Sequence, residues 1–132
     1  MPSTYQKAIQ LCRVYTPPIK KTGTWILVDK LWPRGLRKEK LDFDLWLKEI
    51  APSTALRQWF HQNPDIRWPE FVKRYAAELK EKKLLIEEIQ KMARKSKVTL
   101  FYAAKNTKQN HAIILREVIC AWPKRPKLSS LR

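Results

Sequence analysis

The chain has 132 residues, the length of one domain rather than of two. Apolar residues make up 44% of it and six residues are tryptophans, which excludes a disordered chain, and no apolar run approaches the ~20 residues of a membrane span. Lys and Arg number 28 against 12 Asp and Glu, and the resulting net charge of +16 attracts nucleic acid, anionic lipid or phosphorylated ligands.

The first part of the chain predicts two strands joined by an exposed loop. Residues 8–15 alternate between apolar and polar side chains, and residues 16–24 contain two prolines, two lysines and a glycine. The apolar run at 24–30 has the composition of a strand buried on both faces. Pro33 and Gly35 must end this strand in a sharp turn, because proline fixes its own φ and glycine tolerates a positive one.

Helices are expected next. Asp42 or Asp44 can cap a helix that runs to Ile50, with Leu45, Trp46 and Ile50 as its buried stripe. Ser53 is placed to cap a second, short helix over residues 54–60.

The second half of the chain continues the alternation. A helical pattern begins at Pro69 and extends to about residue 95, with a break expected near 80–83, where the run KEKK interrupts the apolar stripe. A third strand is predicted over 98–103 and a largely buried helix over 108–122.

These elements predict an α/β fold with a small, mostly parallel sheet and helices packed on its faces. We expect a single compact domain over residues 1–122, followed by a basic, proline-broken and flexible tail over 123–132.

Common catalytic and cofactor motifs are absent. Two glycines cannot build a dinucleotide-binding or P-loop motif, and no zinc-type spacing occurs, so the sequence names no cofactor and no metal. Cys12 and Cys120 are expected to be reduced thiols of a cytoplasmic protein without a membrane partner. His61 is read as a residue that suits the carboxyl end of a helix, and Ser53 as a cap rather than a nucleophile.

Two polar loops follow predicted strands, and the carboxyl ends of parallel strands are where open α/β sheets build their sites. Arginine offers a planar fork to carboxylate or phosphate, lysine a compact charge, and the N-terminus of the last helix adds free N–H groups. We therefore predict a pocket for a small ligand that bears phosphate or carboxylate. Its candidate ligand-binding residues are Arg13, Trp32, Arg34, Lys105 and Asn110; Lys30 and Asn106 lie in the same loops.

The chemistry of this pocket has several interpretations. If the protein is an enzyme, Asp29 or His111 must act as acid or base, with Arg34 and Lys105 stabilising negative charge. Asp29 can instead pair with an arginine and simply fix the loops. Two further hypotheses are a basic domain that associates with nucleic acid and a structural module without catalytic activity.

Four ordered segments carry a resemblance. VDKLWPRGL (28–36), DLWLKEIAPST (44–54), LRQWF (56–60) and LFYAAKNTKQNHA (100–112) resemble the YeaO-like branch of the bacterial domain-of-unknown-function family 488, over roughly residues 8–120. This resemblance implies a compact α/β domain of bacterial and archaeal cytoplasm with no settled activity.

The chain departs from that family at two places. Lys30 stands where the commoner pattern has an arginine, which keeps the charge without the planar fork. Relatives in the wider family often carry a cysteine and a Cys-His-Arg element near the last strand, where this chain has Tyr102, Ala103 and Asn110-His111. A cysteine-based chemistry is therefore not expected to carry over.

Overall fold

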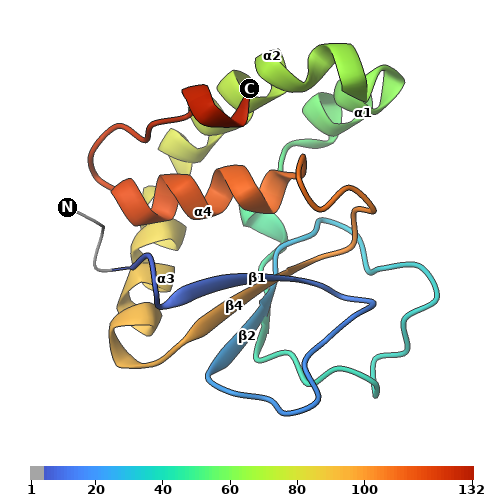
Figure 1. Cartoon of the computed structure of the whole chain (residues 1–132), viewed down its shortest axis with the longest axis vertical. Helices are drawn as coiled ribbons and strands as arrows, with labels where there is room; N and C mark the ends of the chain where they lie inside the picture. Colours follow the sequence, from blue (N-terminus) through green and yellow to red (C-terminus); the bar gives the residue numbers. More distant parts are fainter. Residues whose placement is uncertain (1–4) are drawn as a thin grey trace.

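A computed structural model describes residues 5–132, and within them the chain forms a four-stranded sheet (Figure 1). Its strands are β1 (Ile9–Arg13), β2 (Thr24–Leu27), β3 (Leu45–Trp46) and β4 (Val98–Tyr102), in the spatial order β1-β4-β2-β3. Every pairing is parallel. The sheet confirms the predicted α/β class.

The last strand of the sequence occupies the interior of the sheet. Val98 pairs with Ile9 on one side and with Thr24 on the other. All five residues of β4 are buried, as expected of a central parallel strand whose faces are both covered. Because β2 and β4 are neighbours, the loops that follow them leave the sheet at the same edge.

The helices are α1 (Thr54–Gln62), α2 (Pro64–Leu79), α3 (Lys83–Lys95) and α4 (His111–Ala121). The predicted break near 80–83 is confirmed as a single 3₁₀ turn, Lys80–Lys82, between α2 and α3. The expected cap of α1 is also confirmed, because the Ser53 hydroxyl accepts a hydrogen bond from the Leu56 N–H at 3.2 Å.

Two helix predictions were wrong, one in the type of structure and one in the first residue of the helix. The segment expected to be a helix up to Ile50 forms the short strand β3 and a 3₁₀ turn over Lys48–Ile50. The Asp44 carboxylate accepts from the Trp25 N–H at 2.8 Å instead of capping a helix, which fixes this segment beside β2. In addition, α2 begins at Pro64 rather than at Pro69, because Pro64 occupies the first turn, where a missing N–H costs nothing.

The two faces of the sheet are covered differently. Alternate residues such as Ile26 and Leu100 belong to a large core shared with the helices. Trp25, Leu27 and Phe101 face a smaller core. The segment 32–46, which is irregular up to β3, covers this core with the buried Leu41 and with partly buried side chains. Helices therefore cover one face of the sheet, and the segment 32–46 covers the other.

The basic segment 123–132, which we expected to be a flexible tail, runs back from the end of α4 towards α2 (Figure 1). Leu128 and Leu131 pack against the large core, and the buried Trp68 indole donates to the Leu131 carbonyl. No helix among the described residues has the length and apolar character needed to cross a membrane.

Candidate functional site

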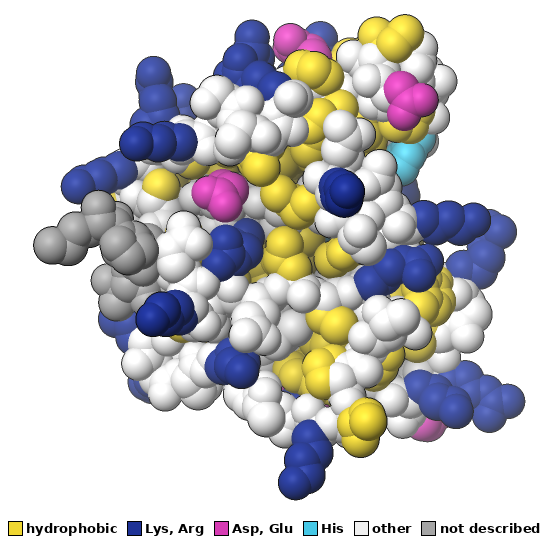
Figure 2. All heavy atoms as spheres, in the orientation of Figure 1, with side chains coloured by type: hydrophobic (Ala, Val, Ile, Leu, Met, Phe, Trp, Pro, Cys, Tyr) yellow, Lys and Arg dark blue, Asp and Glu magenta, His cyan; other side chains and the backbone are white. Residues whose placement is uncertain are grey.

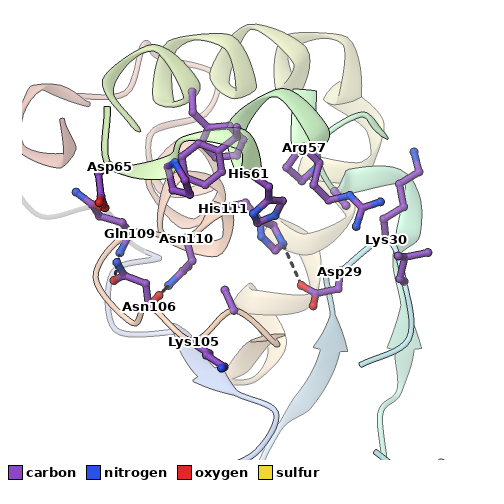
Figure 3. Close-up of a pocket in the computed structure, with 17 residues that line it drawn as sticks. Asp29, Lys30, Arg57, His61, Asp65, Lys105, Asn106, Gln109, Asn110 and His111 are labelled. Atoms are coloured by element: carbon purple, nitrogen blue, oxygen red, sulfur yellow. Dashed lines mark hydrogen bonds and ion pairs between the residues drawn. The ribbon is translucent and has the colours of Figure 1, made fainter. Parts of the chain in front are cut away.

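A pocket of about 320 Å³ opens at the carboxyl ends of β2 and β4 (Figure 3). Its floor comes from the loops that follow these strands, and α1 and the beginning of α2 cover it. The ionisable side chains around it come from segments distant in sequence. They are Asp29, Lys30, Arg57, His61, Asp65, Lys105 and His111.

Asp29 joins the two strand-end loops. Its Oδ2 accepts a hydrogen bond from the Ala103 N–H at 3.0 Å, and its Oδ1 lies 3.2 Å from Nε2 of His111. Its main-chain carbonyl accepts from the Trp46 indole N–H at 2.7 Å. Oδ1 is buried and has no hydrogen-bond partner among the described residues, so its only close polar neighbour is the imidazole. Asp29 therefore pairs with a histidine. The hypothesis that it pairs with an arginine to fix the loops is wrong in the choice of partner.

His111 is held in one orientation at the first position of α4. Its Nε2 lies 3.0 Å from the Val28 carbonyl oxygen. Because a carbonyl only accepts, Nε2 must carry the proton, and Nδ1 is then the basic nitrogen of the neutral ring. The buried Tyr75 ring packs edge-on against the imidazole and donates its hydroxyl to the Ile50 carbonyl at 2.7 Å. Burial raises the pKa of Tyr75 well above its ordinary value, so this phenol stays neutral.

The loop before α4 is shaped by two asparagines. The Asn106 side chain accepts from the N–H groups of Lys108 and Gln109, both at 2.9 Å. The buried Asn110 amide accepts from the Ile113 N–H at 3.1 Å as the cap of α4 and donates to the Asn106 carbonyl at 2.9 Å. These bonds turn the loop so that both Lys105 and the N-terminus of α4 border the pocket.

Two ionisable pocket residues come from α1, and the sequence reasoning did not place them in the pocket. Arg57 and His61 lie one helical turn apart, and in Figure 3 they descend from α1 above the Asp29–His111 pair. Nε of Arg57 is buried and has no hydrogen-bond partner among the described residues. Partial desolvation lowers the pKa of His61, and electrostatic interaction with Arg57 and then with His111 lowers it further. The signal available in sequence was their i, i+4 spacing beside an apolar helical stripe.

Comparison with known proteins agrees with the resemblance seen in the sequence. The family model described as the inactive DUF488-N3 subclade matches residues 8–129. The chain belongs to the DUF488 family. It is 45% identical over 109 residues to the uncharacterized protein YeaO of Escherichia coli K12, covering 83% of this chain and 94% of YeaO. It is 35% identical over 111 residues to an uncharacterized protein of Mycobacterium tuberculosis H37Rv, covering 84% of this chain and 92% of that protein. No solved structure matches the chain.

The family match extends further than the resemblance we drew from the sequence. It ends at residue 129 rather than near 120, so it includes most of the basic segment that follows α4. The match thus includes residues on both sides of the domain boundary that we expected at residue 122.

Three predicted ligand-binding residues of this DUF488 chain lie outside the pocket. Arg13 donates from Nε to the Ala104 carbonyl at 3.0 Å, and thereby supports the loop from behind. The Trp32 ring contacts Phe43 and Trp46 in the smaller core. Arg34 is exposed, and its carbonyl accepts a hydrogen bond from the Tyr15 hydroxyl at 2.6 Å. The structure thus brings together Asp29, Lys105, Asn110 and His111, but not Arg13, Trp32 or Arg34.

The described residues that line the pocket include no cysteine, serine or threonine. Cys12 lies on the smaller core and Cys120 is buried in α4. Among residues 5–132 there is also no group of three or more His, Cys, Asp or Glu side chains arranged to hold a metal ion. The chemistry that the pocket offers is charge, hydrogen bonding and one oriented imidazole.

Proposed function

We propose that this DUF488 protein binds a small anionic ligand, bearing phosphate or carboxylate, in the pocket between α1 and the ends of β2 and β4. The observation that carries the proposal is the guanidinium of Arg57, a residue of the pocket lining, whose Nε is buried and has no hydrogen-bond partner in the part of the chain that the structure describes. A buried donor without a hydrogen-bond partner costs about 1–3 kcal/mol of folding free energy, so its presence in the folded protein calls for an explanation. An oxyanion in the pocket would satisfy it once the Arg57 side chain, which lines the cavity, turned Nε towards the anion.

The charges around Arg57 favour the same ligand class. Lys30, Arg57 and Lys105 are positive, while Asp29 and Asp65 are the carboxylates of the lining. Asp29 is already engaged by the Ala103 N–H and by its contact with His111, so less of its charge faces the cavity. The N-terminus of α4 adds the positive end of a helix dipole at the same edge.

Binding without turnover is the form of this activity that we favour. Among the described residues, the pocket lining has no thiol or hydroxyl side chain, and the matching DUF488-N3 subclade is described as inactive. His111 and Asp29 remain our candidates for acid–base chemistry if a reaction occurs. In a binding protein the same pair positions the loops, since Nε2 of His111 is occupied by the Val28 carbonyl.

The test is calorimetric titration of inorganic phosphate, acetate and adenosine monophosphate into wild type, Arg57→Gln and Arg34→Gln. The two variants lose the same charge, but only Arg57 lines the pocket. A hydrogen bond to a charged group contributes about 1.5–3 kcal/mol, so Arg57→Gln should weaken binding about 10–100-fold. Arg34→Gln should bind as the wild type does.

Thermal unfolding of the same variants separates binding from structural roles. Since Nε of Arg57 has no partner to lose, Arg57→Gln should unfold at the wild-type temperature or above it. Two results would refute the anion pocket and favour the structural module. One is equal ligand affinity of the two variants, and the other is a lower unfolding temperature of Arg57→Gln than of wild type without ligand.

A further inference from the structure

A second hollow lies on the far side of α2 from the pocket described above. It measures about 550 Å³ and runs between α2, the end of α4 and the segment 122–132; we call it the basic groove. Its floor is apolar and includes Ala76, Val118 and Trp122. Its ionisable lining residues are Lys73, Lys80, Lys124, Arg125 and Arg132.

One wall of the basic groove is the C-terminal segment, which buried side chains fix at both ends. The buried Gln90 amide donates to the carbonyls of Ile119 and Trp122, at 2.8 and 3.0 Å. At the other end the Trp68 indole donates to the Leu131 carbonyl. The groove is therefore formed by the fold before any partner arrives. The family match, which reaches residue 129, includes most of this wall.

The charge of the basic groove is one-sided. All five ionisable residues that line it are Lys or Arg, and they stand on both walls. Lys73 on α2 and Lys80, the residue that caps its carboxyl end, are seven residues apart, which places them on one face about 10 Å apart along the helix axis. In Figure 2 dark blue side chains gather at the upper left, the part of the molecule where Figure 1 shows the C-terminal segment and α2. Such spacing suits a ligand with several negative charges along its length.

From these features we infer that the basic groove binds single-stranded nucleic acid. Among the described residues of the lining, every charged side chain is Lys or Arg, which donates hydrogen bonds and accepts none. A phosphodiester backbone brings only acceptors, whereas a peptide backbone brings N–H groups that would find no side-chain acceptor here. The half-buried Trp122 indole, held by an N–H bond to Glu87 at 3.4 Å, offers an aromatic surface for an unpaired base.

The experiment is fluorescence anisotropy with a labelled 15-nucleotide oligothymidylate at 50 and 200 mM salt. The basic-groove variant and its control each replace two lysines and one arginine, all of them exposed, so neither touches the core. The groove variant is Lys73→Gln/Lys80→Gln/Arg125→Gln, and the control is Lys20→Gln/Lys38→Gln/Arg37→Gln.

The expected result follows from counterion release, which gives a slope of about −0.7 per phosphate for single strands. With five cations on five phosphates, wild type and control should lose about 100-fold in affinity between the two salt concentrations. The groove variant, with two cations left, should lose only about sevenfold. The Trp122 indole N–H signal, identified by its loss in Trp122→Phe, should shift when the oligonucleotide is added.

Three results would overturn the inference. Equal salt dependence of the two triple variants would show contact spread over the whole basic surface. An unmoved Trp122 signal would place the strand elsewhere. Tighter binding of an acidic 15-residue peptide than of the oligonucleotide would assign the groove to a protein partner. None of these outcomes bears on the Arg57 pocket, which the groove variants leave intact.

Discussion

Replacing Asp29 by Asn tests whether the Asp29–His111 pair fixes the geometry of the pocket. An amide oxygen can still accept from the Ala103 N–H, but the amide NH₂ would then face Nε2 of His111, which carries its proton towards the Val28 carbonyl. Two donors would meet where a carboxylate oxygen now lies 3.2 Å from the ring. Losing a buried charge-assisted contact in this way should cost about 1–3 kcal/mol.

Thermal and urea unfolding measure this cost. For a chain of 132 residues, 1 kcal/mol corresponds to roughly 4 °C in Tm, so Asp29→Asn should unfold about 4–12 °C lower. Asp42→Asn is the matched control, because its carboxylate is 87% exposed and its pair with Lys21 contributes little. A double-mutant cycle with His111→Gln should give a coupling of at least ~0.5 kcal/mol. Equal Tm values for the Asp29 and Asp42 variants, or a coupling of zero, would refute this reasoning.

Three further predictions concern the frame and the electrostatics of the site. Gly23→Ala should lower the free energy of unfolding, measured in urea titrations, more than Gly35→Ala does. Both glycines have a positive φ, 68° and 77°, but a Cβ at Gly23 would lie 2.0 Å from the carbonyl oxygen of Lys97, whereas a Cβ at Gly35 would meet nothing within 4 Å. Tyr75→Phe should cost about 1–3 kcal/mol by chemical denaturation, because it leaves the buried Ile50 carbonyl without its donor. The pKa of His61 in the folded protein lies below its unfolded value of about 6.5, so its contribution to stability is full above pH ~6.5 and is lost as the pH falls through the folded pKa. Bound phosphate should raise the folded pKa by offsetting nearby positive charge. An NMR titration in which phosphate leaves this pKa unchanged would contradict the pocket.

Much of the fold could be predicted because its strands and helices have strong local signals. The buried run that becomes β2 and the apolar strand β4 are recognisable by composition alone. Leu45, Trp46 and Ile50 misled us because their spacing also fits a helix. That segment becomes a strand and a 3₁₀ turn through non-local bonds, including the one from the Trp25 N–H to Asp44. Such bonds have no local signature.

The candidate site could be predicted only where it follows from sheet topology. Asp29 and His111 meet because parallel neighbours bring their following loops to one edge. Arg57 reaches the pocket because of how α1 packs, which its own sequence does not determine. Trp32 and Arg34 leave the pocket because the segment after β2 turns to cover the opposite face of the sheet, and apolar burial decides that turn.

The anion pocket is tested most directly by following the Nε–H signal of Arg57 in ¹H–¹⁵N spectra during titration with inorganic phosphate. Arg57→Gln identifies the signal, and the exposed Arg34 serves as an internal reference. A buried donor without a partner should acquire a charge-assisted hydrogen bond, so its proton should move downfield and exchange more slowly as phosphate saturates the pocket. A signal of Arg57 that stays fixed, or that moves only as far as that of Arg34, would contradict the proposal that this pocket binds anions.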